Sequence, residues 1–143
     1  MGGSVLVVED EFLIRAAVVD CLSEAGHAVI EAANASSALD ALNSSDVDVA
    51  VVDIRLPGQM DGLALAEWIG AHRPHVQIIL ASGDLNAAAR WAGAKAALWF
   101  LEKPFAGAAL QTMIEAALTG RSAFTPSQQG IPLQVDPRRD CSL

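Results

Sequence analysis

The sequence of 143 residues predicts a doubly wound α/β domain, in which helices cover both faces of a five-stranded parallel sheet. Short runs rich in Val, Ile and Leu alternate with longer segments whose apolar residues recur at helical spacing. The strand-like runs are apolar without alternation, which indicates that both faces of each strand are covered. Right-handed connections between successive parallel strands then place helices on the two sides of the sheet.

The first half of the chain carries three strands and three helices in alternation. The strands are expected at apolar runs, residues 5–8, 29–30 and 49–52. The helices are expected where apolar residues recur at helical spacing, residues 14–25, 38–42 and 63–69. Gly26 is expected to end the first helix, and Asn34, Ser36 or Ser37 to cap the second. Pro74 closes the third helix, because proline cannot continue one.

The second half repeats the alternation and ends in a segment of different character. Strands are expected at 76–80 and 98–101, with a helix near 86–92 between them and a last helix carrying apolar residues from 110 to 118. Residues 121–143 are interrupted by proline and glycine and show no helical period. We therefore expect a single domain at residues 1–120 and a flexible C-terminal tail at residues 121–143.

Composition excludes several classes of protein. Nine basic and seventeen acidic residues give a net charge of −8, which disfavours direct binding to nucleic acid. No apolar run approaches the roughly 20 residues that span a bilayer, so no membrane association is expected. Cys21 is expected to fill the core and Cys141 lies in the tail, which favours a reducing, cytoplasmic setting over a disulfide framework. The three histidines, His27, His72 and His75, lie beside turns and are expected at the surface.

Polar residues follow four of the expected strands. Glu9 and Asp10 end the first strand, Asp53 the third, Ser82 the fourth and Lys103 the fifth. In an open parallel sheet the binding crevice lies at the carboxyl ends of the strands, so these side chains are expected to converge. Three close carboxylates repel unless a cation neutralises them, and Mg²⁺ suits such a set of oxygen ligands.

The same residues carry a resemblance to the receiver domains of two-component response regulators. The resemblance covers residues 4 to about 120 and depends on five motifs in order, Val7–Glu11, Val52–Pro57, Asp61–Gly62, Leu80–Gly83 and Lys103–Phe105. It implies a flavodoxin-like strand order of 2-1-3-4-5. It also implies a signalling switch rather than an enzyme, and because residues 121–143 are too few for an output domain, we expect a stand-alone receiver.

The resemblance assigns a metal site and a phosphoacceptor. Asp53 is implied to accept a phosphoryl group from a histidine kinase or a histidine phosphotransfer protein. Glu9, Asp10 and Asp53 are implied to hold Mg²⁺, directly or through water, with the backbone carbonyl of Arg55 as a further ligand. Glu11 is better explained as an acid at a helix N-terminus.

The remaining roles are also implied by resemblance. Lys103 is expected to pair with Asp53 and then with a phosphoryl oxygen, and the bond from Lys103 to Pro104 is expected to be cis. The Ser82 hydroxyl is expected to bind the phosphoryl group, and Phe100 to act with it as an aromatic switch.

The sequence departs from the usual pattern of receiver domains in two places, the mouth of the pocket and the expected fourth helix. Arg55 and Asp84 flank the pocket with opposite charges, and we expect them to bridge its mouth and slow the entry of hydrolytic water. The fourth helix is expected to be shortened or displaced. At least one of Trp91 and Trp99 is expected to be a core residue. An exposed indole at the other would instead mark a docking patch beside the face of the fourth helix, fifth strand and fifth helix, through which a downstream protein or a second copy of the chain would bind.

Three alternatives are each opposed by one feature of the sequence. A small aspartyl-phosphate hydrolase of the haloacid dehalogenase type would place a second Asp where Arg55 stands. A dinucleotide-binding or flavodoxin-like module would need a glycine-rich first turn, but residues 9–12 are acidic and contain no glycine. A degenerate receiver that acts only as a binding module would lack some of the acidic residues, the serine or the lysine, whereas this sequence has all of them.

Overall fold

The computed structural model describes residues 2–83 and 98–119. Several predictions lie outside these residues: the helix near 86–92 and its displacement, the positions of Asp84 and Trp91, and the tail at 121–143. The proposed homodimer face includes that helix and is likewise untested.

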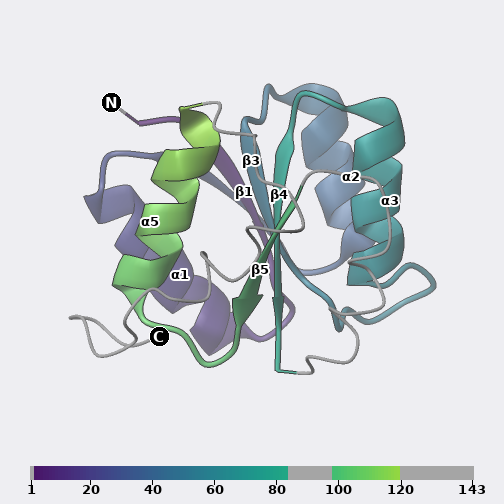
Figure 1. Ribbon diagram of the computed structural model, residues 1–143. Coiled ribbons are helices and arrows are strands. Elements are labelled where there is room, and N and C mark those ends of the chain that lie inside the picture. Colours follow the sequence, from purple (N-terminus) through teal and green to yellow (C-terminus); the bar gives the residue numbers. More distant parts are fainter. Residues whose placement is uncertain (1, 84–97, 120–143) are drawn as a thin grey trace.

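Five parallel strands form one sheet in the order β2-β1-β3-β4-β5 (Figure 1). The strands are β1 (Ser4–Val8), β2 (Ala28–Ala32), β3 (Val49–Asp53), β4 (Gln77–Ser82) and β5 (Leu98–Glu102). Each strand pairs in parallel with its neighbours in the sheet. The predicted fold class and strand order are therefore confirmed.

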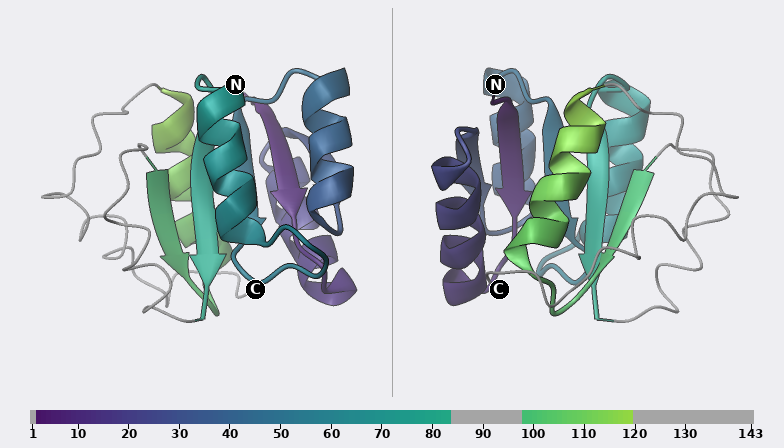
Figure 2. Two further views of the ribbon diagram at one scale, coloured as in Figure 1. Left: turned by 90° about the vertical axis from the view of Figure 1, so that its right-hand side faces the viewer. Right: turned by 60° about the vertical axis from the view of Figure 1, so that its left-hand side comes forward.

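Helices cover the two faces of the sheet in pairs (Figure 2). On one face lie α1 (Phe12–Glu24) and α5 (Gly107–Leu118), and on the other lie α2 (Ala35–Ser44) and α3 (Gly62–His72). Each helix begins earlier than its apolar pattern indicates, because that pattern marks only the core-facing turns. Of the three candidate caps of α2, Asn34 is the one at the N-cap position, where its side chain accepts a hydrogen bond from the Ser37 N–H at 2.8 Å.

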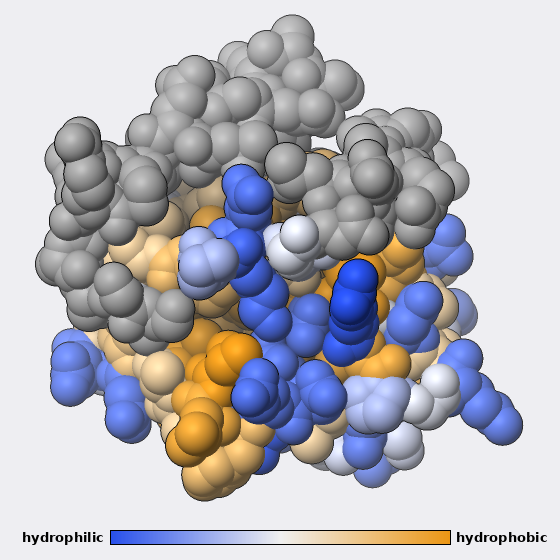
Figure 3. Space-filling model, turned by 90° about the horizontal axis from the view of Figure 1, so that it is seen from below, coloured by the Kyte–Doolittle hydropathy of each residue, from blue (hydrophilic) through white to orange (hydrophobic). Residues whose placement is uncertain are grey.

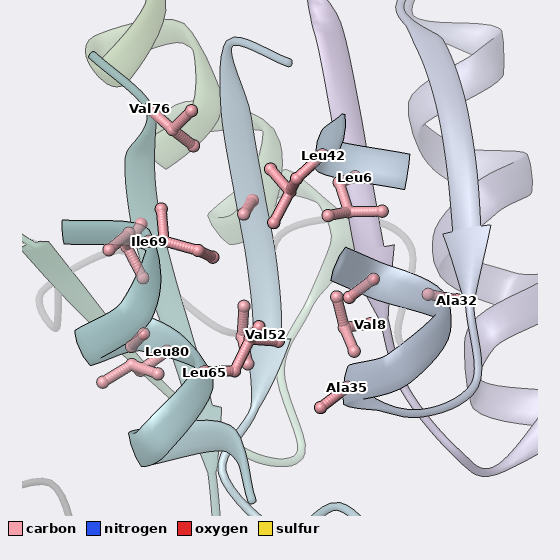
Figure 4. Packing of buried hydrophobic residues seen from close by; sticks show 14 of the residues in the cluster. Leu6, Val8, Ala32, Ala35, Leu42, Val52, Leu65, Ile69, Val76 and Leu80 are labelled. Atoms are coloured by element: carbon pink, nitrogen blue, oxygen red, sulfur yellow. The ribbon is translucent and has the colours of Figure 1, made fainter. Parts of the chain in front are cut away.

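The apolar runs divide their side chains between two cores. In β1, Leu6 and Val8 face the α2–α3 side, whereas Val5 and Val7 face the α1–α5 side. Figure 4 shows Leu6 and Val8 packed with residues of α2, α3 and the neighbouring strands. Burial on both faces explains why the strands carry apolar residues without alternation. No helix of the described residues has the length and apolar character needed to cross a membrane.

One prediction about the histidines is wrong and two are confirmed. His27 is buried, with 6% of its surface exposed, whereas His72 and His75 are exposed. Gly26, with φ of +96°, turns the chain after α1 and brings His27 beneath the N-terminal segment. There the His27 Nδ1 accepts a hydrogen bond from the Gly3 N–H at 3.1 Å. Cys21 is buried, as predicted.

Candidate functional site

The side chains predicted to form the site lie at the edge of the sheet where the strands end. Glu9 and Asp10 follow β1, Asp53 is the last residue of β3, Ser82 ends β4 and Lys103 follows β5. Figure 3 views this edge of the molecule and shows hydrophilic residues across its middle, with apolar surface to either side. The expected convergence is observed for Glu9, Asp10, Asp53 and Lys103, and Ser82 lies at the same edge as the last residue of the neighbouring strand β4.

Lys103 joins two of the acidic residues. Its Nζ lies 2.9 Å from Glu9 Oε1 and 3.3 Å from Asp53 Oδ2. The Glu9 and Asp53 side chains are only 8% and 9% exposed, and that of Lys103 is 20% exposed. The pair with Asp53 was expected from the resemblance, but the shorter contact with Glu9 was not. It joins residues that follow β1 and β5, two strands that are not neighbours in the sheet.

The three carboxylates are close enough to share a cation. Glu9, Asp10 and Asp53 each offer an oxygen atom, and these atoms all lie within 4.8 Å of one another. Asp10 is exposed, so the cluster is open to solvent on one side. Hard oxygen donors of this kind fit Mg²⁺, which keeps several waters and takes one or two carboxylates directly. The donor set is therefore compatible with the predicted metal.

The electrostatics of the cluster leave negative charge in excess. Burial raises the pKa of the Glu9 carboxyl, and the charge of Asp53 adds to this effect, outweighing the hydrogen bond from Lys103. Burial alone would lower the pKa of Lys103, but its hydrogen bond to Glu9 and the charges of Asp53 and Glu9 raise it instead. Lys103 thus remains a cation, but one ammonium does not balance three acids, so a bound divalent cation would relieve the remaining repulsion.

Backbone groups fix the orientation of two carboxylates. The Glu11 N–H donates to Glu9 Oε2 at 3.2 Å, and the Arg55 N–H donates to Asp53 Oδ1 at 3.1 Å. Each carboxylate therefore has one oxygen on a backbone N–H and the other on Lys103. This arrangement holds the acids in place before any ligand is bound.

Gly62 explains part of the Asp61–Gly62 motif in physical terms. The helix α3 begins against the end of β3, where the Gly62 N–H donates to the Ile54 carbonyl at 2.8 Å. A Cβ atom at Gly62 would collide with the Asp53 carbonyl oxygen and lie 2.6 Å from the Ile54 Cα. Asp61 caps the same helix by accepting a hydrogen bond from the Ala64 N–H at 2.9 Å. The absence of a side chain at residue 62 lets the helix approach the strand end that carries Asp53.

The remaining predicted residues occupy different environments. Ser82 is buried, with 5% exposed, and Phe100 is half-buried and packs against the core on the α2–α3 side. Arg55 is exposed, but Asp84 lies outside the described residues, so their expected bridge is untested. The bond from Lys103 to Pro104 is cis, as predicted. Trp99 is 7% exposed and fills the core on the α1–α5 side, in agreement with the expectation that at least one of the two tryptophans is a core residue.

Arg15 was missed in the sequence. Its Nη1 donates to the backbone carbonyl of Glu9 at 2.7 Å, and its Nε lies 3.1 Å from Glu31 Oε1. The sequence does place Arg15 in the first turns of a helix that begins at the site. Because helical side chains project back towards the helix N-terminus, this position could have indicated that Arg15 reaches the site.

Comparison with known proteins identifies the family. The family model described as the response regulator receiver domain matches residues 5–115. The DNA-binding transcriptional regulator NtrC of Escherichia coli strain K12 is 37% identical over 136 residues, which make up 94% of this chain and 28% of that protein. The signal receiver domain of an HD domain-containing protein from Pseudomonas fluorescens Pf-5 aligns with a TM-score of 0.77 and 27% identity, covering 86% of this chain and 99% of the other. The response regulator TrrA from Thermotoga maritima, solved in complex with Mg²⁺-BeF, aligns with a TM-score of 0.73 and 27% identity, covering 82% and 99% of the two chains.

The chain belongs to the response regulator receiver domain family. It is a signalling domain of the two-component type, which confirms the resemblance seen in its motifs. The chain spans 28% of the length of NtrC, so the DNA-binding activity named for that regulator is a property of that protein.

Proposed function

We propose that the chain is a phosphorylation-dependent switch in which Asp53 accepts a phosphoryl group from a phosphohistidine. One observation carries the proposal: Lys103 Nζ lies within 3.3 Å of Asp53 Oδ2 and 2.9 Å of Glu9 Oε1, in a cluster of three carboxylates. The donor is a histidine kinase or a histidine phosphotransfer protein, and a downstream protein reads the phosphorylated state.

Asp53 is suited to act as the nucleophile. Its carboxylate is held by the Arg55 N–H and by Lys103, which limits its rotation before a donor arrives. In the transfer, a carboxylate oxygen of Asp53 forms a bond to phosphorus while the bond between phosphorus and the donor imidazole nitrogen breaks. The electron pair of that bond stays on the imidazole nitrogen, which takes up a proton. Lys103 can follow the negative charge from the carboxylate to a phosphoryl oxygen.

Glu9, Asp10 and Asp53 would hold Mg²⁺, with the backbone carbonyl of Arg55 as the proposed further ligand. When bound, the ion supplies positive charge against the phosphoryl oxygens during transfer. The fit rests on three carboxylate oxygens within 4.8 Å of one another. The TrrA structure, described as a complex with Mg²⁺-BeF, supports the same assignment for a relative of this fold.

The switch would act through charge at the edge of the sheet. Phosphorylation replaces the single negative charge of the Asp53 carboxylate with a phosphoryl group that carries roughly 1.5 to 2 negative charges and extends further from the strand end. Ser82 ends the neighbouring strand, one residue beyond Ala81, the register partner of Asp53. We propose that its hydroxyl donates to the phosphoryl group and that Phe100 on β5 repacks in response, which changes the surface presented to a partner. We place the protein in the cytoplasm, where its phosphodonors would act.

The alternatives have less support. Arg55 occupies the position at which a haloacid dehalogenase-type hydrolase needs its second acid, and the family match is to receiver domains. A degenerate receiver would lack part of the acidic set or the lysine, and all of these groups lie together here.

Intact-mass spectrometry tests the proposal. The protein is incubated with Mg²⁺ and phosphoramidate, as wild type, Asp53→Asn and Asp48→Asn. Asp48 is the matched control, because its carboxylate accepts the Ser4 N–H at 2.9 Å at the opposite edge of the sheet. We expect one phosphoryl adduct on the wild type and on Asp48→Asn, and none on Asp53→Asn. Equal labelling of all three proteins would contradict the assignment, and continuous release of phosphate from phosphate esters would favour the hydrolase.

A further inference from the structure

Arg15 in α1 connects the metal-binding cluster to the edge strand of the sheet. Its Nη1 donates to the carbonyl oxygen of Glu9 at 2.7 Å, and its Nε pairs with Glu31 Oε1 on β2 at 3.1 Å. Its guanidinium carbon also lies 5.6 Å from the centroid of the Phe12 ring. The side chain is 15% exposed, so it is held in a nearly buried position rather than free in solvent.

The carbonyl that Arg15 contacts lies between two of the three acids, Glu9 and Asp10. It belongs to the peptide group between Glu9 and Asp10, so its orientation affects the direction of both side chains. The register of β1 with both neighbouring strands ends at Val8. Beyond that point the ladder no longer restrains the chain, although the Glu9 N–H still donates to the Ala32 carbonyl at 3.0 Å. The guanidinium supplies the restraint on the other side of Glu9.

We infer that Arg15 is a positioning residue for the divalent-cation site, fixing the peptide between Glu9 and Asp10 and fixed in turn by Glu31. The inference rests on the proposed function, because it assumes that the acidic cluster binds Mg²⁺. Arginine suits the task, since its planar fork of donors can hold two acceptors at once. The positive charge of Arg15 by itself would repel a cation, and the carboxylate of Glu31 offsets that charge.

A variant that conserves net charge separates geometry from electrostatics. Arg15→Met with Glu31→Gln removes one charge of each sign and keeps side chains of similar length. We expect its dissociation constant for Mg²⁺, measured by calorimetry, to rise about tenfold, as for other groups that orient metal ligands. If this variant does not fold, Arg15→Lys serves instead: its single ammonium cannot span both acceptors, and we expect a several-fold rise.

Arg73 provides the matched control. It makes the same kinds of contact away from the site, donating to the His72 carbonyl at 2.9 Å and to Asn43 Oδ1 at 2.7 Å. Its guanidinium carbon lies 5.3 Å from the centroid of the Trp68 ring. We expect Arg73→Met to lower the melting temperature without changing the affinity for Mg²⁺.

The outcomes distinguish the inference from the proposed function. Tenfold weaker Mg²⁺ binding in the charge-conserving variant, with Arg73→Met binding like the wild type, supports the role of Arg15. Two results would overturn that role alone. One is a dissociation constant for Mg²⁺ in the charge-conserving variant that lies within about twofold of the wild type, and the other is an equally large loss of Mg²⁺ affinity in Arg73→Met. Wild-type protein that binds no Mg²⁺ at millimolar concentrations overturns the metal site of the proposed function and the inference with it.

Discussion

Gly62→Ala is expected to disturb the site through the backbone of β3. A Cβ atom at residue 62 would collide with the Asp53 carbonyl oxygen and would lie 2.6 Å from the Ile54 Cα and 2.8 Å from the Asp53 carbonyl carbon. Ordinary contacts of this kind begin near 3.4 Å, and all three atoms belong to the backbone. The start of α3 or the end of β3 must therefore move by roughly 1 Å, a form of overpacking.

The expected cost follows from this displacement. Overpacking typically costs about 1–3 kcal/mol of folding free energy. For a domain of this size, that cost lowers the melting temperature by roughly 3–12 °C. A misplacement of about 1 Å near reacting groups can slow a reaction by about 100-fold, so the phosphorylation of Asp53 should slow beyond any effect of stability.

Gly83→Ala is the matched control, because Gly83 follows Ser82 at the same edge of the sheet. A Cβ atom there would have the Lys103 carbonyl oxygen as its nearest contact, at 4.0 Å, so no displacement is needed. Thermal melts and rates of labelling by phosphoramidate, taken well below the melting temperature, compare the two variants with the wild type. A melting temperature and a rate for Gly62→Ala that match those of Gly83→Ala would refute the reasoning.

Three further variants test the electrostatics of the pocket. Folding raises the pKa of the Glu9 carboxyl above 4.5, which means that the folded state favours the protonated acid. The stability that Glu9 contributes is therefore present below pH 4.5 and is lost as the pH rises through the pKa of the folded state. Glu9→Gln should therefore be more stable than the wild type in metal-free thermal melts at neutral pH, and a less stable variant would contradict the raised pKa. Lys103→Met removes the cation from two buried carboxylates and should lose about 3 kcal/mol in urea unfolding, whereas a loss below about 1 kcal/mol would argue against the pair. Arg55→Ala should release phosphate from Asp53 faster in a time course of intact mass, and an unchanged lifetime would exclude a protective role for the exposed Arg55 side chain.

The sequence was sufficient for features that depend on local pattern. Apolar runs without alternation predicted strands with two covered faces, and the division of Val5 and Leu6 between opposite cores confirms the reason. Because parallel strands bring their carboxyl ends to one edge, the meeting of Asp53 and Lys103 followed from the order of the strands. The strand order itself and the cis bond before Pro104 came from resemblance to a family.

Features that depend on long-range geometry could not be predicted. The contact of Lys103 with Glu9 joins residues 94 positions apart that follow strands without a common ladder. His27 was expected at the surface because it follows a turn, but that turn brings it under the chain at Gly3. Trp99 lies on β5, whose apolar residues face both cores, so the sequence did not specify which face of the sheet its side chain covers. The role of Arg15 depends on its contacts with the Glu9 carbonyl and with Glu31 on β2, and its position in the first turns of a helix does not specify these partners.

The most direct test of the account is to identify the residue that carries the phosphoryl group. Wild-type protein is labelled with phosphoramidate and Mg²⁺, reduced with borohydride to convert an acyl phosphate to an alcohol, and mapped by peptide mass spectrometry. We expect homoserine at residue 53, and no label when Mg²⁺ is chelated before the donor is added. Labelling at a different carboxylate, or at residue 53 to the same extent without a divalent cation, would contradict it.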